Sequence, residues 1–166
     1  MTLAIEESAR PICVAALYCF APLADCERLR GPLKQLCDDQ GIRGTLLLAS
    51  EGINGTIAGS RVGIDRVLDH IRAWPGCAEP ELKFSSAATM PFHRMKVRVK
   101  SEIVTMGQPG IDPVANAGTY VDPLDWNALI DDPDTIVIDT RNDYEVSIGS
   151  FAGSINPMTA TFRGFP

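Results

Sequence analysis

The sequence lacks the features that would place the chain in a membrane or on an export route. No apolar run approaches the roughly 20 residues that a helix needs to cross a bilayer. The first residues include Glu6 and Glu7 and lack the basic-then-apolar pattern of a signal peptide. We therefore expect a cytoplasmic protein with no membrane partner.

Cysteine and histidine are few, and their spacing does not suit a metal. The odd set of five cysteines contains no CxxC pair, which argues against both a disulfide framework and a zinc site. The two histidines, His70 and His93, lack the partners that a catalytic triad or a metal centre would need. The residues identify no metal site and no cofactor, and whether a metal or flavin is used stays open.

Charge is divided unevenly along the chain. Through Met106 there are 13 Lys and Arg against 12 Asp and Glu, whereas from Gly107 onward there are 2 against 9. A composition shift of this kind predicts two units rather than one. Residues 107–118 are rich in Gly and Pro and lack periodicity, so we predict a domain over 1–106, a linker over 107–118 and a second, incomplete domain over 119–166.

The front domain reads as an α+β fold. Short strands are predicted at residues 12–20, 45–49, 55–58 and 82–84, and residues 95–104 are expected to be extended. Two helices with apolar stripes follow the first and third strands, with Asp25 and Ser60 as N-caps. Gly31 and Pro32 predict a kink or a late start in the first helix. This order is the split βαβ, ferredoxin-like arrangement.

Residues 50–54 are expected to form the turn of a hairpin, because Gly52, Asn54 and Gly55 can supply a positive φ. Glu51 and Asn54 would then sit on the turn, where they could face a substrate. The alternative is structural: Asn tolerates the turn conformation, and Glu is simply solvated.

The rear unit begins with a short helix, predicted from Asp122 to Ile130, with proline in its first turn. Residues 135–139 (TIVID) are strongly apolar, which predicts a fully buried strand of a parallel sheet.

Four cations alternate with apolar residues near the end of the front domain: Arg94, Lys96, Arg98 and Lys100, here called the basic row. Successive side chains of a strand point to opposite faces, so the basic row shares one face while Met95, Val97 and Val99 point to the core. Such a row suits a phosphate backbone. The alternatives are a solvated face, or an edge strand protected by lysine against aggregation.

Two long segments, residues 51–59 (EGINGTIAG) and 91–107 (PFHRMKVRVKSEIVTMG), together resemble the N-terminal domain of the rhodanese-related tRNA uridine hydroxylases. The resemblance implies oxygen-dependent 5-hydroxylation of the wobble uridine, with tRNA as partner, molecular oxygen as co-substrate and no DNA. The basic row would then help to hold RNA, and Glu51 and Asn54 could face the substrate or the rhodanese loop.

Residues 137–141 (VIDTR), with Tyr144, Glu145 and Gly149, are similar to the opening of a rhodanese domain. Asp139 and Arg141 would pair, or would brace the active-site loop, which the resemblance places beyond Pro166, from the end of a parallel strand. The resemblance implies a catalytic cysteine beyond Pro166, at the head of a helix that favours its thiolate. None of the five cysteines present fits that position, so no catalytic residue is assigned.

Three other functions remain open at this stage. A rhodanese-type sulfurtransferase would carry a persulfide on the same cysteine, and a non-catalytic RNA-binding or adaptor module would need none. Acylphosphatase chemistry needs a phosphate-cradling loop with an arginine after the first strand. Residues 21–25 (APLAD) contain no glycine, and no arginine precedes Arg28 there, which argues against that activity.

Overall fold

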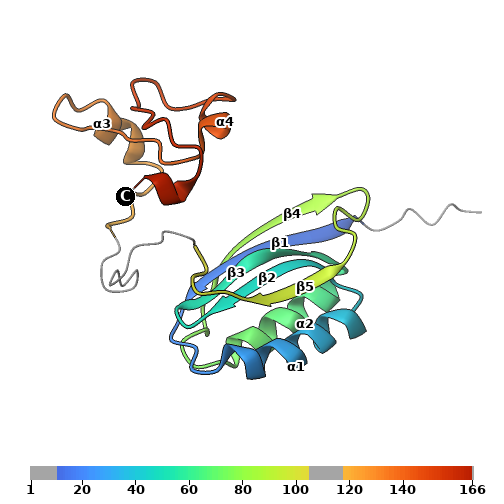
Figure 1. Cartoon of the computed structure of the whole chain (residues 1–166). Helices are drawn as coiled ribbons and strands as arrows, with labels where there is room; N and C mark the ends of the chain where they lie inside the picture. Colours follow the sequence, from blue (N-terminus) through green and yellow to red (C-terminus); the bar gives the residue numbers. More distant parts are fainter. Residues whose placement is uncertain (1–10, 105–117, 166) are drawn as a thin grey trace, which may run out of the picture. The chain divides into compact units, whose positions relative to one another are not determined.

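The structure is a computed structural model that describes residues 11–104 and 118–165 (Figure 1). It divides into two compact units, Met1–Val104 and Thr105–Pro166, and each is described by itself. All but the last residue of the predicted linker lies outside the described residues. Among the helices of the described ranges, none is long and apolar enough to cross a membrane.

The first unit is a five-stranded sheet with two helices. Its strands lie in the order β4-β1-β3-β2-β5. Neighbouring strands are antiparallel except β2 and β5, which are parallel. The elements are β1 (Ile12–Phe20), α1 (Cys26–Asp39), β2 (Arg43–Ala49), β3 (Gly52–Gly59), α2 (Arg61–Arg72), β4 (Glu81–Ala87) and β5 (Met95–Val99). The predicted α+β, ferredoxin-like fold is confirmed, with β5 added as an edge strand.

The core lies between the sheet and the two helices, which cover the same face (Figure 1). Alternate strand residues supply it from the sheet side, including Leu17, Leu46 and Ile57, each at most 2% exposed. In α2 the apolar stripe of Ile64, Val67, Leu68 and Ile71 is fully buried against them. We call the opposite side of the sheet the open face, because no helix within residues 11–104 covers it.

Both predicted helix caps are present. The Asp25 side chain accepts from the Arg28 N–H at 3.1 Å, and the Ser60 hydroxyl accepts from the Gly63 N–H at 3.1 Å. The predicted late start of α1 is wrong, because the helix begins at Cys26 and contains Pro32. Proline cannot bond the carbonyl four residues earlier, that of Arg28. Arg28 and Pro32 are both exposed, so water can solvate this carbonyl.

The hairpin between β2 and β3 is tighter than predicted. Its turn is only Ser50 and Glu51, while Gly52 and Asn54 already belong to β3. Gly52 has the expected positive φ, at +146°. Asn54 does not, and among the described non-glycine residues only Met158 has a positive φ. The role predicted for Asn54 in turn geometry is therefore wrong.

The second unit holds little regular structure. It contains α3 (Trp126–Ile130), α4 (Asp143–Val146) and a 3-10 turn η1 (Phe162–Gly164). The predicted buried strand at 135–139 is wrong: the segment forms a single parallel bridge, between Ile138 and Ile155. Ile136 is 73% exposed and Ile138 49% exposed. A buried strand needs sheet neighbours on both sides and cover on both faces, and residues 118–165 do not supply them.

Candidate nucleic-acid interface

The basic row lies along β5 and its two flanks. Met95 is buried, and Val97 and Val99 pack against the core, so the alternate residues project from the open face. The ladder with β2 continues past both ends of β5, since the Gly44 N–H donates to the Arg94 carbonyl at 3.2 Å and the Lys100 N–H donates to the Leu48 carbonyl at 2.8 Å. All four cations are therefore held on one extended stretch of backbone.

These cations are not neutralised within the described part of the chain. Five other cations pair with a carboxylate within one helical turn, as Arg61 does with Asp65 and Arg72 with Asp69. No such ion pair joins the basic row to a described carboxylate. A row of unpaired cations on a flat surface attracts a polyanion, because each contact releases counterions.

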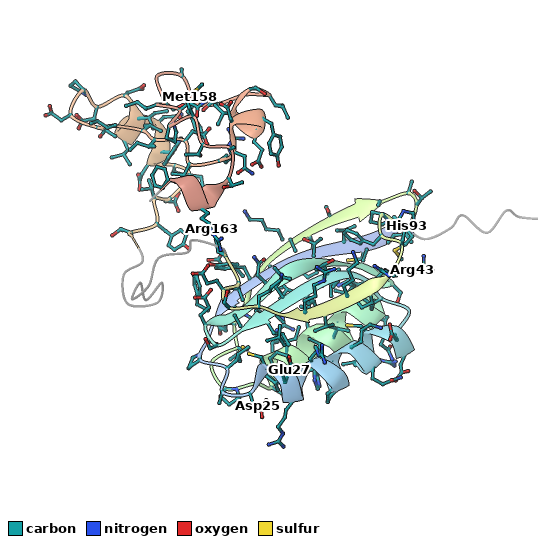
Figure 2. The ribbon with its side chains drawn as sticks, viewed as in Figure 1. Asp25, Glu27, Arg43, His93, Met158 and Arg163 are labelled. Atoms are coloured by element: carbon teal, nitrogen blue, oxygen red, sulfur yellow. The ribbon has the colours of Figure 1, made fainter. Side chains whose placement is uncertain are left out.

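A groove runs between α1 and the edge strand β5. It has a volume of about 480 Å³, and its lining includes Arg30 and Lys34 from α1 as well as Arg94, Lys96 and Arg98. Arg30 and Lys34 are partly neutralised by Glu27 and Asp38, and Figure 2 shows Glu27 on α1. The groove widens the positive surface beyond the sheet itself.

Strand register extends this surface across the open face. Residues paired across a sheet point to the same side. One row of partners is Arg98, Leu47, Asn54, Tyr18 and Glu81, and the next is Lys96, Thr45, Thr56, Ala16 and Lys83. Arg43, labelled in Figure 2, starts β2 on the same face. Lys83, Tyr18 and Arg43 were not predicted as part of this surface, because alternation within one strand does not show which strands are neighbours.

Glu51 and Asn54 hold the segment that follows β5. The Ile103 N–H donates to Glu51 Oε1 at 2.6 Å, and Asn54 Nδ2 donates to the Ile103 carbonyl at 3.0 Å. Ile103 is 2% exposed. After β5 the chain therefore crosses β2 on the open face and is fixed at β3. We call these two bonds the Ile103 clamp; it joins the two segments, 51–59 and 91–107, that carry the family resemblance.

The loop after β1 is not a phosphate cradle. The Ala21 N–H donates to the Glu51 carbonyl at 2.9 Å, and the Leu23 N–H donates to the Ser50 carbonyl at 3.0 Å. An anion site of this type needs backbone N–H groups that point at the ligand. Two of the loop's donors are already satisfied by the β2–β3 turn, in agreement with the missing arginine.

Cys37 and Cys77 are not set up as nucleophiles. All five cysteines are free thiols in the first unit. Burial raises the pKa of Cys37 to about 12, with a smaller contribution from Asp38. Burial also raises the pKa of Cys77 to about 12, with Cys19 beside it adding to the effect. A thiol in this state stays protonated at neutral pH and is inert. No group of three His, Cys, Asp or Glu residues within 11–104 and 118–165 could hold a metal ion.

In the second unit, Asp139 and Arg141 form a two-pronged ion pair. Arg141 Nε donates to Asp139 Oδ1 at 2.9 Å, and a terminal nitrogen donates to Oδ2 at 2.6 Å. The Ser150 hydroxyl donates to the same Oδ2 at 2.6 Å. Hydrogen bonds from Arg141 and then from Ser150 hold the pKa of Asp139 well below its usual range. This bond from Ser150, which lies 11 positions from Asp139, was not predicted from the sequence.

This pair borders a cavity of about 670 Å³, which is also lined by Trp126, Gly149 and Phe151. The second Arg141 contact, from its terminal nitrogen to the Gly149 carbonyl at 2.6 Å, ties the end of segment 137–141 to the loop at 149–151. The pair therefore ties segment 137–141 to the loop at 149–151, while its predicted role at the active-site loop expected beyond Pro166 stays a prediction.

The first unit thus defines a class: a ferredoxin-like α+β domain with a cation-lined sheet face that no helix of residues 11–104 covers. A protein-family profile described as "UPF0176 acylphosphatase like domain" matches residues 12–103, and the chain belongs to this family.

Curated relatives extend the match along the chain. A protein of Brucella suis named tRNA uridine(34) hydroxylase is 65% identical over 156 residues, which are 94% of this chain and 51% of the relative. A Brucella anthropi protein of the same name is 63% identical over the same shares. The chain spans about half the length of these relatives.

Solved structures of low identity were also found. An acylphosphatase from Coxiella burnetii is 10% identical, with a TM-score of 0.40, over 57% of this chain and 100% of that one. One from Bacillus subtilis is 10% identical, with a TM-score of 0.41, over 52% and 98%.

Proposed function

We propose that this chain is the N-terminal part of a tRNA uridine hydroxylase, and that its first unit binds the tRNA whose wobble uridine is modified. The names of the Brucella relatives support the reaction. The observation that supports RNA binding is the basic row, four cations on one face of β5 that have no described carboxylate partner. Such a protein works in the cytoplasm, where tRNA is modified.

The division of labour follows from what the first unit can and cannot do. Its buried thiols with raised pKa values cannot serve as nucleophiles at neutral pH. The cysteine that the reaction is expected to use would belong to the rhodanese-like part. Molecular oxygen would be the co-substrate. The first unit contributes affinity and position: phosphate contacts fix where an RNA lies without reading its sequence.

The test is charge reversal within the basic row of the intact protein. Lys96→Glu with Arg98→Glu should weaken tRNA binding at least tenfold. The slope of the logarithm of Kd against the logarithm of salt concentration should fall by roughly one for each cation removed. The measurement is the Kd of tRNA at several salt concentrations, together with the amount of 5-hydroxyuridine formed under single-turnover conditions at saturating tRNA.

The matched control is Arg61→Glu with Arg72→Glu, which removes two cations from α2 on the covered face. This control should leave the salt dependence unchanged. Equal effects of the two double variants would show that only net charge matters, and the proposed role of β5 would be wrong. A thiolated base in place of 5-hydroxyuridine would overturn the proposed reaction in favour of sulfur transfer.

A further inference from the structure

A hollow on the open face lies beside Tyr18. It has a volume of about 180 Å³, and it is lined by residues of β1, β3 and β4. The lining includes Ala16, Tyr18, Asn54, Thr56, Glu81 and Lys83. The hollow exists because Ala16 and Thr56 are short and are paired with each other, while the longer Tyr18 and Lys83 rise beside them.

The Tyr18 ring forms one wall of this hollow. Along β1, Tyr18 stands between Phe20 and Ala16 on the open face. The Tyr18 and Phe20 rings meet edge to face, with centroids 4.8 Å apart and planes at 82°. Phe20 thus supports the ring from one side. The hollow lies on the other side, because Ala16 lines it and Phe20 does not.

Polar groups surround the same space. Lys83 can donate, the Glu81 carboxylate can accept, and Asn54 uses its Nδ2 on Ile103 while its Oδ1 accepts no hydrogen bond from a described residue. An aromatic wall with donors and acceptors beside it is the arrangement that recognises an unstacked nucleobase. The volume is below the roughly 300–1,000 Å³ of sites for whole small ligands, which favours a single ring.

Cations lie on both edge strands of the sheet, on the same face as the hollow. Lys83 is on the edge strand β4, and Lys96 and Arg98 are on the opposite edge strand β5, in the same two cross-strand rows. With strands about 4.8 Å apart, Lys83 and Lys96 are separated by roughly 19 Å. An RNA strand whose base enters the hollow would have Lys83 beside it on β4 and, beyond the Ile103 clamp, the basic row along β5.

We propose that the hollow beside Tyr18 binds one unpaired nucleobase of the RNA, with the base stacked on the Tyr18 ring. This inference rests on the proposed function, and it adds a specific requirement: the site takes single-stranded RNA, such as a loop, and rejects a duplex whose bases are stacked inside. Edge contacts come from Glu81, Lys83 and Asn54.

The experiment measures Kd by fluorescence anisotropy for the intact protein with three RNAs: a short single-stranded oligoribonucleotide, the same backbone without bases, and a duplex. Tyr18→Ala should weaken binding of the single strand roughly 5- to 150-fold and leave its salt dependence unchanged. Tyr18→Phe keeps the ring and should stay close to the original protein. Ala16→Leu places a longer side chain in the hollow and should act like Tyr18→Ala.

Phe84→Ala is the matched control, since Phe84 is an exposed aromatic of β4 on the helix side, stacked with Arg61 at 4.2 Å. It should bind every RNA normally. Circular dichroism and the thermal midpoint establish whether each variant is folded. If Tyr18→Ala does not fold, Ala16→Leu still tests the site.

The outcomes separate this inference from the proposed function. Normal single-strand binding by Ala16→Leu and Tyr18→Ala, or equal affinity of the original protein for the strand with and without bases, would overturn the base site. In either case the proposed role of the basic row in RNA binding would still hold if Lys96→Glu with Arg98→Glu weakened binding. Loss of binding in Tyr18→Ala with a normal double charge variant would instead support the base site and overturn the role of β5.

Discussion

Glu51 and Ile103 are joined by a short hydrogen bond across 52 positions of the chain, from the Ile103 N–H to Glu51 Oε1 at 2.6 Å. Glu51 lies in the two-residue turn between β2 and β3, and Ile103 lies beyond the end of β5. Asn54 completes the Ile103 clamp from β3. The two residues singled out as candidates for the substrate side of a turn thus hold backbone, and they fix the path by which the chain leaves the sheet.

Removing the Glu51 carboxylate should destabilise the first unit. Glu51→Ala leaves the buried Ile103 N–H without its acceptor, which costs about 1–3 kcal/mol. The measurement is urea unfolding, together with hydrogen exchange of the Ile103 amide, which should become faster. Glu27→Ala removes a carboxylate from an exposed ion pair with Arg30 and should cost less than about 1 kcal/mol. Equal losses in the two variants would show that the clamp does not stabilise the fold.

Gly52 should tolerate no side chain. It opens β3 with φ at +146°, and an added Cβ would lie 2.0 Å from the Cys19 carbonyl oxygen. Gly52→Ala should therefore lower the free energy of unfolding by about 3 kcal/mol or more, because both the conformation and the β1–β3 ladder are strained. Gly31→Ala adds a Cβ that meets nothing within 4 Å, and the change there should stay within about 1 kcal/mol. A thermal midpoint of Gly52→Ala close to that of the original protein would contradict this account.

The buried thiols predict a loss of stability in alkali. An unfolded cysteine has a pKa of about 8.5, whereas burial raises the pKa of Cys37 to about 12 in the folded state. Between these values the folded state keeps a proton that the unfolded state loses. The contribution is therefore fully present below the unfolded pKa, and it is lost as pH rises toward the folded one.

The measurement is the urea midpoint from about pH 7 to about pH 11, for the original protein and for Cys37→Ala. The variant should be less stable at neutral pH because of the cavity, but its stability should fall less steeply in alkali. Parallel curves would show that Cys37 does not contribute to the pH dependence. Alkylation followed by mass spectrometry should find Cys37 and Cys77 unreactive in the folded protein.

The hydroxyl of Ser150 should lower the pKa of Asp139. Ser150→Ala removes a donor that stabilises the carboxylate, so the pKa of Asp139 should rise, while Arg141 still holds it below its usual range. The measurement is an NMR titration of the carboxyl carbon. Ser154→Ala is the control, because Ser154 bonds Ser150 and not Asp139. A larger shift in the control than in Ser150→Ala would contradict this assignment.

The sequence predicts elements whose signals are local. β1 begins and ends where its apolar run does, and Asp25 and Ser60 cap their helices as expected. Pro32 was misleading because a helix tolerates proline when the freed carbonyl meets water, and exposure at Arg28 depends on tertiary structure. Asn54 was misplaced because asparagine is common in turns, whereas its actual partner, Ile103, lies 49 positions away.

The candidate site shows the same limit. The basic row follows from alternation within one strand, so its common face could be predicted. The hollow beside Tyr18 depends on the pairing of β1 with β3 and β4, which one strand's pattern does not determine. The segment at 135–139 has the composition of a central strand, but its burial depends on neighbours that residues 118–165 do not provide.

β5 is bonded to the sheet through β2 alone. An edge strand can detach while the other three pairings survive, so β5 should open more often than the inner strands β1, β3 and β2. A ligand that binds only the closed form shifts such an opening equilibrium by mass action. RNA held by the basic row would therefore slow amide exchange most strongly in β5 and at Ile103, and the strand that supplies the positive charge would itself report the occupancy of the site.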